Sequence, residues 1–327
     1  MRQFTRTAVL ASALLLSLTT ATRAYAWGSP GHMAVAYLAW NQLTPTQQAR
    51  VIVLLQLNPM YPQWDSWIQA AVPGISQADH DRDIFMLAAT WPDEIKIDPA
   101  YTGGDDIPAG TPTPEPGAYG DGHAHKYWHF IDTPYSPDNT APSPTPPSPN
   151  AQDQITYFTA QIKDPTVPDP QKSFDLSWLE HLVGDIHQPL HATTRYLKGV
   201  SDNGGNSVKL KGGSQSELHA YWDDLPGTPA GSGSKQMDDF AVAIAFANQA
   251  PALTKTQKQQ IQDMAVSDWV KESFKMAKSD TYAPPIKTGT TAVSLTQTYK
   301  TRAMKDAHLR IAFAGARLAA LIQANLV

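Results

Sequence analysis

Histidine and aspartate recur at helical spacing in two places of the chain. His181 and Asp185 are four residues apart within the stretch Leu179–His191, and His219 and Asp223 repeat the same spacing. Residues four apart on a helix lie on one face, so each pair would present an imidazole beside a carboxylate. Zinc binds both kinds of group. A single pair of this type arises often by chance, but two pairs so close in the sequence predict a metal-binding protein.

The segment around the first pair has to position it. We expect a helix over 173–190, with an apolar face made by Leu182, Val183 and Ile186. Pro189 lacks the amide hydrogen that a helix needs, so the helix should end or kink there. That bend would turn His191 back toward the same site.

The first 26 residues have the pattern of a secretory signal peptide. Arg2 and Arg6 precede an apolar run, Ala8–Leu18, that is short for a membrane span, and Ala24-Tyr25-Ala26 matches a cleavage site. We therefore expect an exported protein, periplasmic or secreted, with one globular domain over 27–327. Cleavage would free the amine of Trp27, which in its neutral form is a good zinc ligand together with its carbonyl oxygen.

Composition restricts the possibilities further. The 327 residues include ten histidines and no cysteine, so disulfides and thiolate zinc sites are excluded. The formal net charge is −5, and loss of residues 1–26 would remove three arginines, which argues against a broad basic face for nucleic acid. A bound metal could supply local positive charge instead. No run after residue 26 is apolar enough to be a membrane span.

The remaining patterns predict a mainly α protein with at most a small β-hairpin. A turn over 202–206 should precede a short strand at 207–210, and the segment 133–150, with seven prolines, should be an extended surface loop. Besides the helix over 173–190, helices are expected over 33–40, 49–57, 64–72, 77–90, 153–162, 216–224, 235–248, 255–278 and 295–326.

Further ligands are needed to complete metal sites around the two pairs. Asp93 follows an aromatic-proline turn, His129 lies among aromatic residues, and His32 is close to the new N-terminus. His123 and His125 are expected to be solvated loop residues. His187, two residues past Asp185, should face away from that residue on the helix.

Six motifs in this order resemble the zinc nucleases of the S-one/P-one type, which prefer single strands, and their bacterial relatives. The resemblance spans nearly all of the chain after residue 26, and Ala314–Ala319 also resembles the last helix of that family. The motifs are Trp27-Gly with Gly31-His32, Ala89–Asp93, His129–Asp132, His181–His191, Gly204–Asn206 and Leu218–Asp223.

The resemblance implies a single all-helical domain, similar to the fold shared with zinc phospholipase C, that holds three Zn²⁺ ions. It assigns one ion to Asp93, His129, His181 and Asp185. A second would be held by Trp27, His32 and the shared Asp185, and a third by His191, His219 and Asp223. The other histidines, at 80, 123, 125, 187 and 308, would not be ligands.

The resemblance also implies an endonuclease that hydrolyses single-stranded DNA and RNA to 5′-phosphate products, with 3′-nucleotidase activity on mononucleotides. Asp93 and Lys96 would be catalytic, with Lys96 at the scissile phosphate. Phe130 could stack on an unpaired base, a contact worth about 1–3 kcal/mol. Asp132 would accept from a base edge, and Asn206 would bind phosphate. No protein partner is implied, and we expect a monomer.

Two alternatives remain open from the sequence. A zinc phospholipase C would use a similar site on lipid phosphodiesters, although Lys96, Phe130 and Asp132 favour the nuclease. A non-catalytic, exported zinc-binding protein would turn over neither substrate, but storage sites tend to be saturated by protein ligands. Hydrolysis of denatured DNA compared with phosphatidylcholine separates the three possibilities.

Overall fold

The computed structural model describes residues 27–227, 235–286 and 291–326, and these residues form a mainly helical protein with a small sheet, as predicted. Within these ranges no helix has the length and apolar character needed to cross a bilayer. The signal peptide predicted over 1–26 lies outside the described residues.

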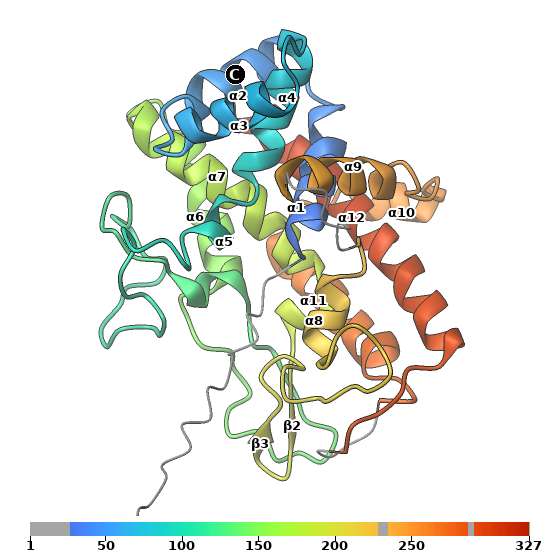
Figure 1. Ribbon diagram of the computed structural model, residues 1–327. Helices are drawn as coiled ribbons and strands as arrows, with labels where there is room; N and C mark the ends of the chain where they lie inside the picture. Colours follow the sequence, from blue (N-terminus) through green and yellow to red (C-terminus); the bar gives the residue numbers. More distant parts are fainter. Residues whose placement is uncertain (1–26, 228–234, 287–290, 327) are drawn as a thin grey trace, which may run out of the picture.

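Figure 1 shows α1 and α7 in the middle of the molecule, α2 to α4 at one end and the strands at the other. Shorter helical elements are the 3₁₀ turns η1 (Lys126–His129) and η2 (Pro189–Ala192) and the π-turn η3 (Ala277–Thr281). The α-helices are α1 (Ser29–Trp40), α2 (Pro45–Leu55), α3 (Tyr61–Ala71), α4 (Gln77–Ala88), α5 (Trp91–Glu94), α6 (Ala151–Lys163), α7 (Asp169–His187), α8 (Leu218–Asp223), α9 (Lys235–Ala247), α10 (Lys255–Gln260), α11 (Val266–Met276) and α12 (Gln297–Asn325).

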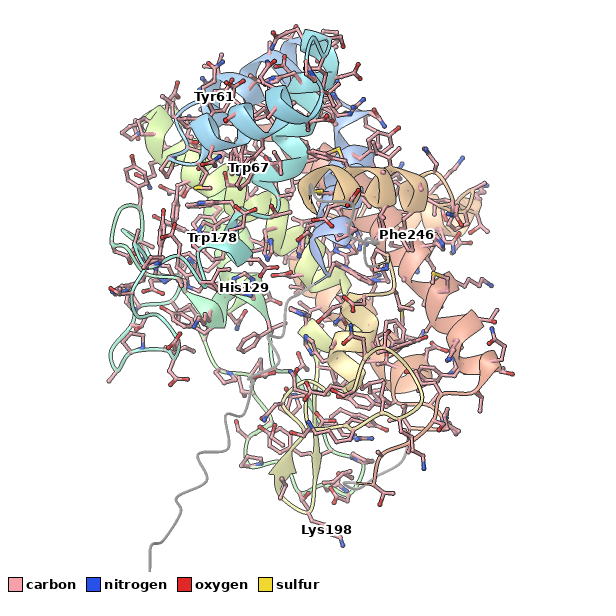
Figure 2. The ribbon with its side chains drawn as sticks, in the orientation of Figure 1. Tyr61, Trp67, His129, Trp178, Lys198 and Phe246 are labelled. Atoms are coloured by element: carbon pink, nitrogen blue, oxygen red, sulfur yellow. The ribbon has the colours of Figure 1, made fainter. Side chains whose placement is uncertain are left out.

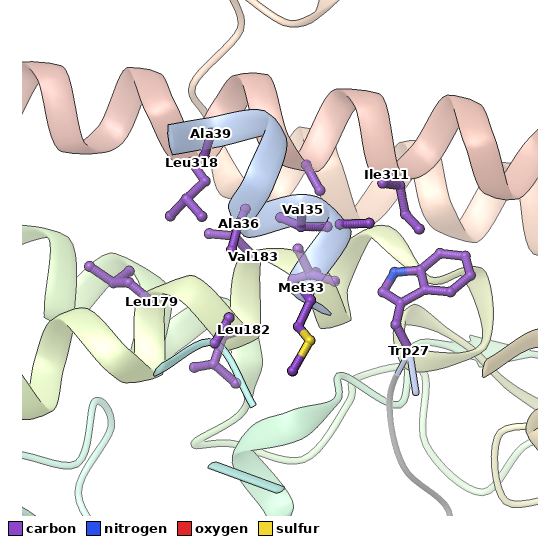
Figure 3. Close-up of a cluster of buried hydrophobic side chains, with 14 of the residues drawn as sticks. Trp27, Met33, Val35, Ala36, Ala39, Leu179, Leu182, Val183, Ile311 and Leu318 are labelled. Atoms are coloured by element: carbon purple, nitrogen blue, oxygen red, sulfur yellow. The ribbon is translucent and has the colours of Figure 1, made fainter. Parts of the chain in front are cut away.

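The core is built around α1, which is apolar on nearly every side and is covered by α7, α9 and α12. Helices that are apolar all round are stable only when buried. Figure 3 shows Val35 and Ala36 of α1 with Val183 of α7 and Ile311 of α12 in this core. Close packing needs Gly315 on α12, since a Cβ there would lie 2.6 Å from Cβ of Leu38. This packing fixes the start of α1, and with it His32, against α7.

The small sheet is confirmed, but its predicted position was wrong. The hairpin joins β2 (Thr194–Leu197) and β3 (Val200–Ser201), and β1 (Pro134–Tyr135) adds to β2 in parallel. Residues 207–210 form only isolated bridges. The actual turn places Lys198 and Gly199 at positive φ. Glycine adopts positive φ without strain. The prediction placed the turn instead at the glycine-rich segment 202–206, which follows this hairpin.

The single helix predicted over 255–278 was also wrong, because the chain leaves the helix between α10 and α11. There Asp263 accepts a hydrogen bond from Ala265 N at 3.0 Å through its side chain. Its carbonyl oxygen accepts another from the Trp269 indole at 2.7 Å. These bonds replace helical ones with a local turn, as aspartate often does.

Candidate metal centre

Six separate segments bring the predicted ligands to one side of the core. Helix α7 carries His181 and Asp185, and it ends at His187 ahead of Pro189, as predicted. The η2 turn then directs His191 back, so that its Nδ1 donates to the carbonyl oxygen of His129 at 2.6 Å. The remaining candidates come from the N-terminal segment and α1, from α5, from η1 and from α8, and they are Trp27, His32, Asp93, His129, His219 and Asp223.

Asp185 is the centre of the first group of donors. Its Oδ1 lies 3.3 Å from His32 Nε2, and its Oδ2 lies 3.3 Å from His181 Nε2 and 3.1 Å from His129 Nδ1. Asp93 Oδ1 lies 3.6 Å from His181 Nε2 and 3.8 Å from His129 Nδ1. Two three-residue groups of possible ligands therefore meet here and share His181, while Asp185 reaches the donors of both.

A third group lies at the end of η2 and on α8. His219 Nε2 is 3.4 Å from Asp223 Oδ2 and 3.0 Å from His191 Nε2. Gln188 Nε2 donates to Asp223 Oδ1 at 2.7 Å and so orients that carboxylate. All nine predicted ligands are buried.

Main-chain carbonyl oxygens fix the proton on three of the imidazoles. His181 Nδ1 donates to Ala89 O, and His219 Nδ1 donates to Gly204 O, each at 2.7 Å. With His191 bonded to His129 O in the same way, the Nε2 atom of each ring keeps its lone pair. Metal-ligating histidines are oriented in this manner.

The donor atoms fit zinc. Ligands about 2.1 Å from a tetrahedral zinc lie about 3.4 Å apart, and the separations above fall around that value. The lone pairs of His191 and His219 face each other at 3.0 Å, which is repulsive without a cation between them. Within the described residues, both nitrogens of His32, Oδ1 of Asp185 and Oδ2 of Asp223 have no hydrogen-bond partner. Buried polar atoms left in this state are costly, and a bound ion would satisfy them.

The pKa shifts of the buried groups also favour a bound metal ion. Burial lowers the pKa of His32, His129 and His181 well below the usual value, so these rings are neutral at pH 7, as metal ligands must be. Burial, and next the charge of Asp93, raises the pKa of Asp185 well above its usual range. Divalent cations would hold that carboxylate ionised.

The main chain at Trp27 lies between the groups. The Trp27 indole donates to Gly184 O at 3.0 Å, directly before Asp185, and Gly28 N donates to Asp223 O at 2.9 Å. Gly184 permits the close approach of His32, because a Cβ at this position would lie 2.9 Å from His32 Nδ1. These contacts hold the chain at Trp27 and Gly28 against α7 and α8, the helices that carry Asp185 and Asp223.

A cavity of about 350 Å³ is lined by His129 of the second group and by His191 and His219 of the third. Lys96 lines it and forms a 2.6 Å ion pair with Asp93 Oδ1. Phe130 also lines it and is 36 % exposed, so it is not a core aromatic residue. Asp132, whose pKa burial raises, accepts from the Thr194 hydroxyl, and Asn206 Nδ2 donates to Asn203 O at 2.7 Å. All four predicted substrate contacts therefore share one cavity.

The histidines predicted to be non-ligands have other surroundings. His187 points away from Asp185: its Nδ1 donates to Val183 O, and its Nε2 accepts from the Arg317 guanidinium at 2.8 Å. His80 pairs with Asp65, and His308 stacks on Phe246. The prediction for His125 was wrong, since it is fully buried and stacks on Trp128 with the ring centroids 3.8 Å apart. Tyr127 and Trp128 follow within three positions, and both rings pack against it. His123 remains partly exposed.

Three functional neighbours were missed from the sequence. Gln188 orients Asp223, and both Lys126 and Asn203 line the cavity. Gln188 directly precedes Pro189, and Lys126 lies three residues before His129, so the nearness of both to predicted site residues was a usable signal. No pattern in the sequence distinguishes Asn203 from an ordinary turn residue.

Fold and site together define a helical protein with buried groups of histidine and aspartate that could hold metal ions, beside a cavity with lysines on its wall. Figure 2 labels His129, one of these candidate ligands, in the middle of the molecule. The sequence profile of the S1/P1 Nuclease family matches residues 27–326, and the chain belongs to that family. "Endonuclease 3" of Arabidopsis thaliana is 24% identical over 209 residues, which cover 62% of this chain and 55% of that protein. The chain thus spans about half the length of this curated relative.

Proposed function

We propose that this protein is an exported zinc-dependent endonuclease. It would hydrolyse phosphodiester bonds of single-stranded DNA and RNA to 5′-phosphate products and act on 3′-mononucleotides. The observation that carries the proposal is the set of neutral imidazoles and buried carboxylates whose donor atoms lie about 3.4 Å apart. Three of these imidazoles, those of His129, His191 and His219, lie on the wall of one cavity.

Three zinc ions are proposed, held by the nine ligands from Trp27 to Asp223 named above. Bound zinc would lower the pKa of a water to about 7 and neutralise charge on the phosphate. Removal of residues 1–26 would free the Trp27 amine, and the hydrogen bonds of Trp27 and Gly28 to either side support its place among the ligands.

The protein's own residues would orient the substrate. Asp93 holds the Lys96 ammonium on the cavity wall, where it can bind the scissile phosphate. Asp93 can also accept a hydrogen bond from the attacking water and so orient it. Phe130 exposes its ring for an unpaired base, whereas a base in a duplex would first have to leave its stack, at a cost of a few kcal/mol. Asp132 and Asn206 supply polar contacts to base and phosphate.

The cavity favours a nucleic acid over a lipid. Lys96, Lys126, Asp132 and two asparagines on its wall offer partners for phosphate oxygens and base edges. Hydrolysis of the phosphodiester in phosphatidylcholine is therefore the competing outcome of the test.

The experiment compares purified, zinc-equilibrated protein on denatured DNA, RNA, 3′-AMP and phosphatidylcholine vesicles. We expect turnover of the first three, with 5′-phosphate ends, and its loss in His219→Asn. His308→Asn is the matched control, since it removes a histidine outside the metal centre. Turnover of lipid alone would reverse the assignment, and zinc binding without turnover of any substrate would indicate a storage protein.

A further inference from the structure

A second group of potential ligands lies outside the proposed catalytic centre, in the loop that leads into η1. Asp121, His123 and His125 alternate along this loop, and their donor atoms converge. Asp121 Oδ2 lies 3.1 Å from His125 Nε2 and 3.6 Å from His123 Nδ1. These separations bracket the 3.4 Å or so expected between ligands of a tetrahedral zinc. The group shares no residue with the three groups described above.

The hydrogen bonds of the buried His125 ring leave one nitrogen for a cation. Tyr127 donates its hydroxyl proton to Glu115 Oε2 at 2.6 Å, so its oxygen accepts from His125 Nδ1 at 3.2 Å. In that tautomer His125 Nε2 carries a lone pair, and it faces the Asp121 carboxylate at 3.2 Å from Oδ1 and 3.1 Å from Oδ2. Two acceptors at this distance repel each other unless a cation lies beside them. Burial lowers the pKa of His125, so a protonated ring is a poor substitute for that cation.

The backbone holds these donors in place before any ion binds. Asp121 Oδ1 accepts from His123 N at 2.8 Å, which fixes the carboxylate, and Trp128 stacks on the His125 ring. His125 adopts φ +41°, and Gly104 lies so close that a Cβ there would be 2.7 Å from His125 N. Such rigid support from neighbouring residues lowers the entropic cost of binding an ion.

The site is open on one side. The side chains of Asp121 and His123 are 29% and 44% exposed, and both residues line a cavity of about 480 Å³. A metal with three protein ligands would keep a fourth position for water or another small ligand.

We propose that Asp121, His123 and His125 form a further site for a divalent transition-metal ion, zinc foremost. Two imidazoles and one carboxylate suit zinc better than magnesium or calcium, which prefer oxygen donors alone. The ion would fasten the loop four residues ahead of His129, and it would stabilise that segment rather than take part in hydrolysis.

Elemental analysis of zinc per chain tests this proposal after equilibration with zinc and gel filtration. Asp121→Asn and His123→Asn should each hold one zinc ion fewer than the parent, whatever number the other positions hold. Asp106→Asn, an exposed carboxylate of the preceding loop, is the matched control and should hold as many as the parent. Both ligand variants change partly exposed side chains, and His125, which packs in the core, is left intact.

Equal zinc content in the parent and in both folded ligand variants would overturn the proposal. Zinc should also raise the melting temperature of the parent more than that of His123→Asn. Hydrolysis of denatured DNA by His123→Asn should stay within about twofold of the parent. The two proposals can therefore fail separately. Equal zinc contents would exclude the loop site without affecting the nuclease proposal. Absence of DNA hydrolysis in the parent would leave the difference in zinc content between parent and ligand variants as evidence for the loop site.

Discussion

His191 Nδ1 donates to the main-chain oxygen of His129 at 2.6 Å, so a candidate ligand of one metal group is oriented by the backbone of a ligand of another. A shift of η1 that moves the His129 backbone would also move the carbonyl oxygen that orients the His191 ring. The metal groups are therefore expected to respond together to changes in either segment.

Gln188 should tune the third group through Asp223. Its amide donates to Asp223 Oδ1 at 2.7 Å, and its side-chain oxygen accepts from Leu190 N at 2.5 Å, at the start of the turn that carries His191. Replacement of such supporting partners lowers metal affinity roughly 10–100-fold. In Gln188→Ala we expect activity to fall at limiting zinc and to recover at high zinc. Gln249→Ala, which removes an exposed glutamine just past the end of α9, is the control, and equal zinc titrations for the two variants would contradict this role.

The position of the N-terminus supplies a second prediction. Protein that begins at Trp27 is compared with protein that carries one additional alanine before it. The extension converts the Trp27 amine into an amide, which is a poor zinc ligand, while Trp27 and Gly28 keep their hydrogen bonds to Gly184 and Asp223. We expect one zinc ion fewer and a loss of activity of at least about 100-fold, on the scale of losing a catalytic electrostatic group. Full activity in the extended protein would exclude the amine as a ligand.

Gly184 should tolerate no side chain. A Cβ would lie 2.9 Å from His32 Nδ1, between α7 and α1. Overpacking of this kind typically costs about 1–3 kcal/mol of unfolding free energy. Gly184→Ala should therefore lower the melting temperature and the zinc content together. Gly213→Ala, where nothing lies within 4 Å of the new Cβ, should change neither, and a stable, zinc-replete Gly184→Ala would show that His32 can move freely.

Substitution of Lys96 should affect mainly kcat, whereas substitution of Phe130 should affect mainly KM. Lys96→Met removes the cation that Asp93 holds on the cavity wall, and a drop of about 10²–10³ in kcat is expected for a group at the phosphate. Phe130→Ala removes an exposed stacking surface, so KM for single strands should rise by roughly 5- to 150-fold, with kcat little changed. Steady-state kinetics on an oligonucleotide measure both effects. The same change in kcat for both variants would refute the division of roles.

Much of the fold could be predicted because its signals are local. Thr44 and Gln47 form a capping box that starts α2, a pattern contained in four consecutive residues, and Pro189 stops α7 ahead of the His191 turn. The break between α10 and α11 was missed, because it depends on the Trp269 indole reaching Asp263 O. A sequence pattern shows which side chains are present, but it does not show with which carbonyl oxygen a side chain such as the Trp269 indole forms a hydrogen bond.

The candidate ligands were predictable for a different reason. His181 and Asp185 belong to one helix, so their spacing alone places them together. Their meeting with His32 and His129 depends on tertiary packing, and there the resemblance to a known family carried the assignment. His125 shows the limit of local reasoning, since its glycine-rich loop indicated a solvated side chain while Trp128 covers it.

Asp175 gives a prediction for the pH dependence of stability. Burial raises its pKa to about 8, and Oδ2 of its side chain has no hydrogen-bond partner within the described residues. The unfolded chain should titrate near 3.8, so the folded state binds an extra proton between about pH 4 and pH 8. The stabilising effect of that proton is complete below pH 4 and is lost progressively as the pH rises from 4 through 8.

Asp175→Asn carries no charge at any pH and should escape this loss. Relative to the parent, its melting temperature should therefore rise by several degrees between pH 5 and pH 8. Both proteins are measured at saturating zinc, so that the pH dependence of metal binding cancels in the difference. A difference in melting temperature that stays constant over this range would mean that Asp175 is ionised in the folded protein throughout.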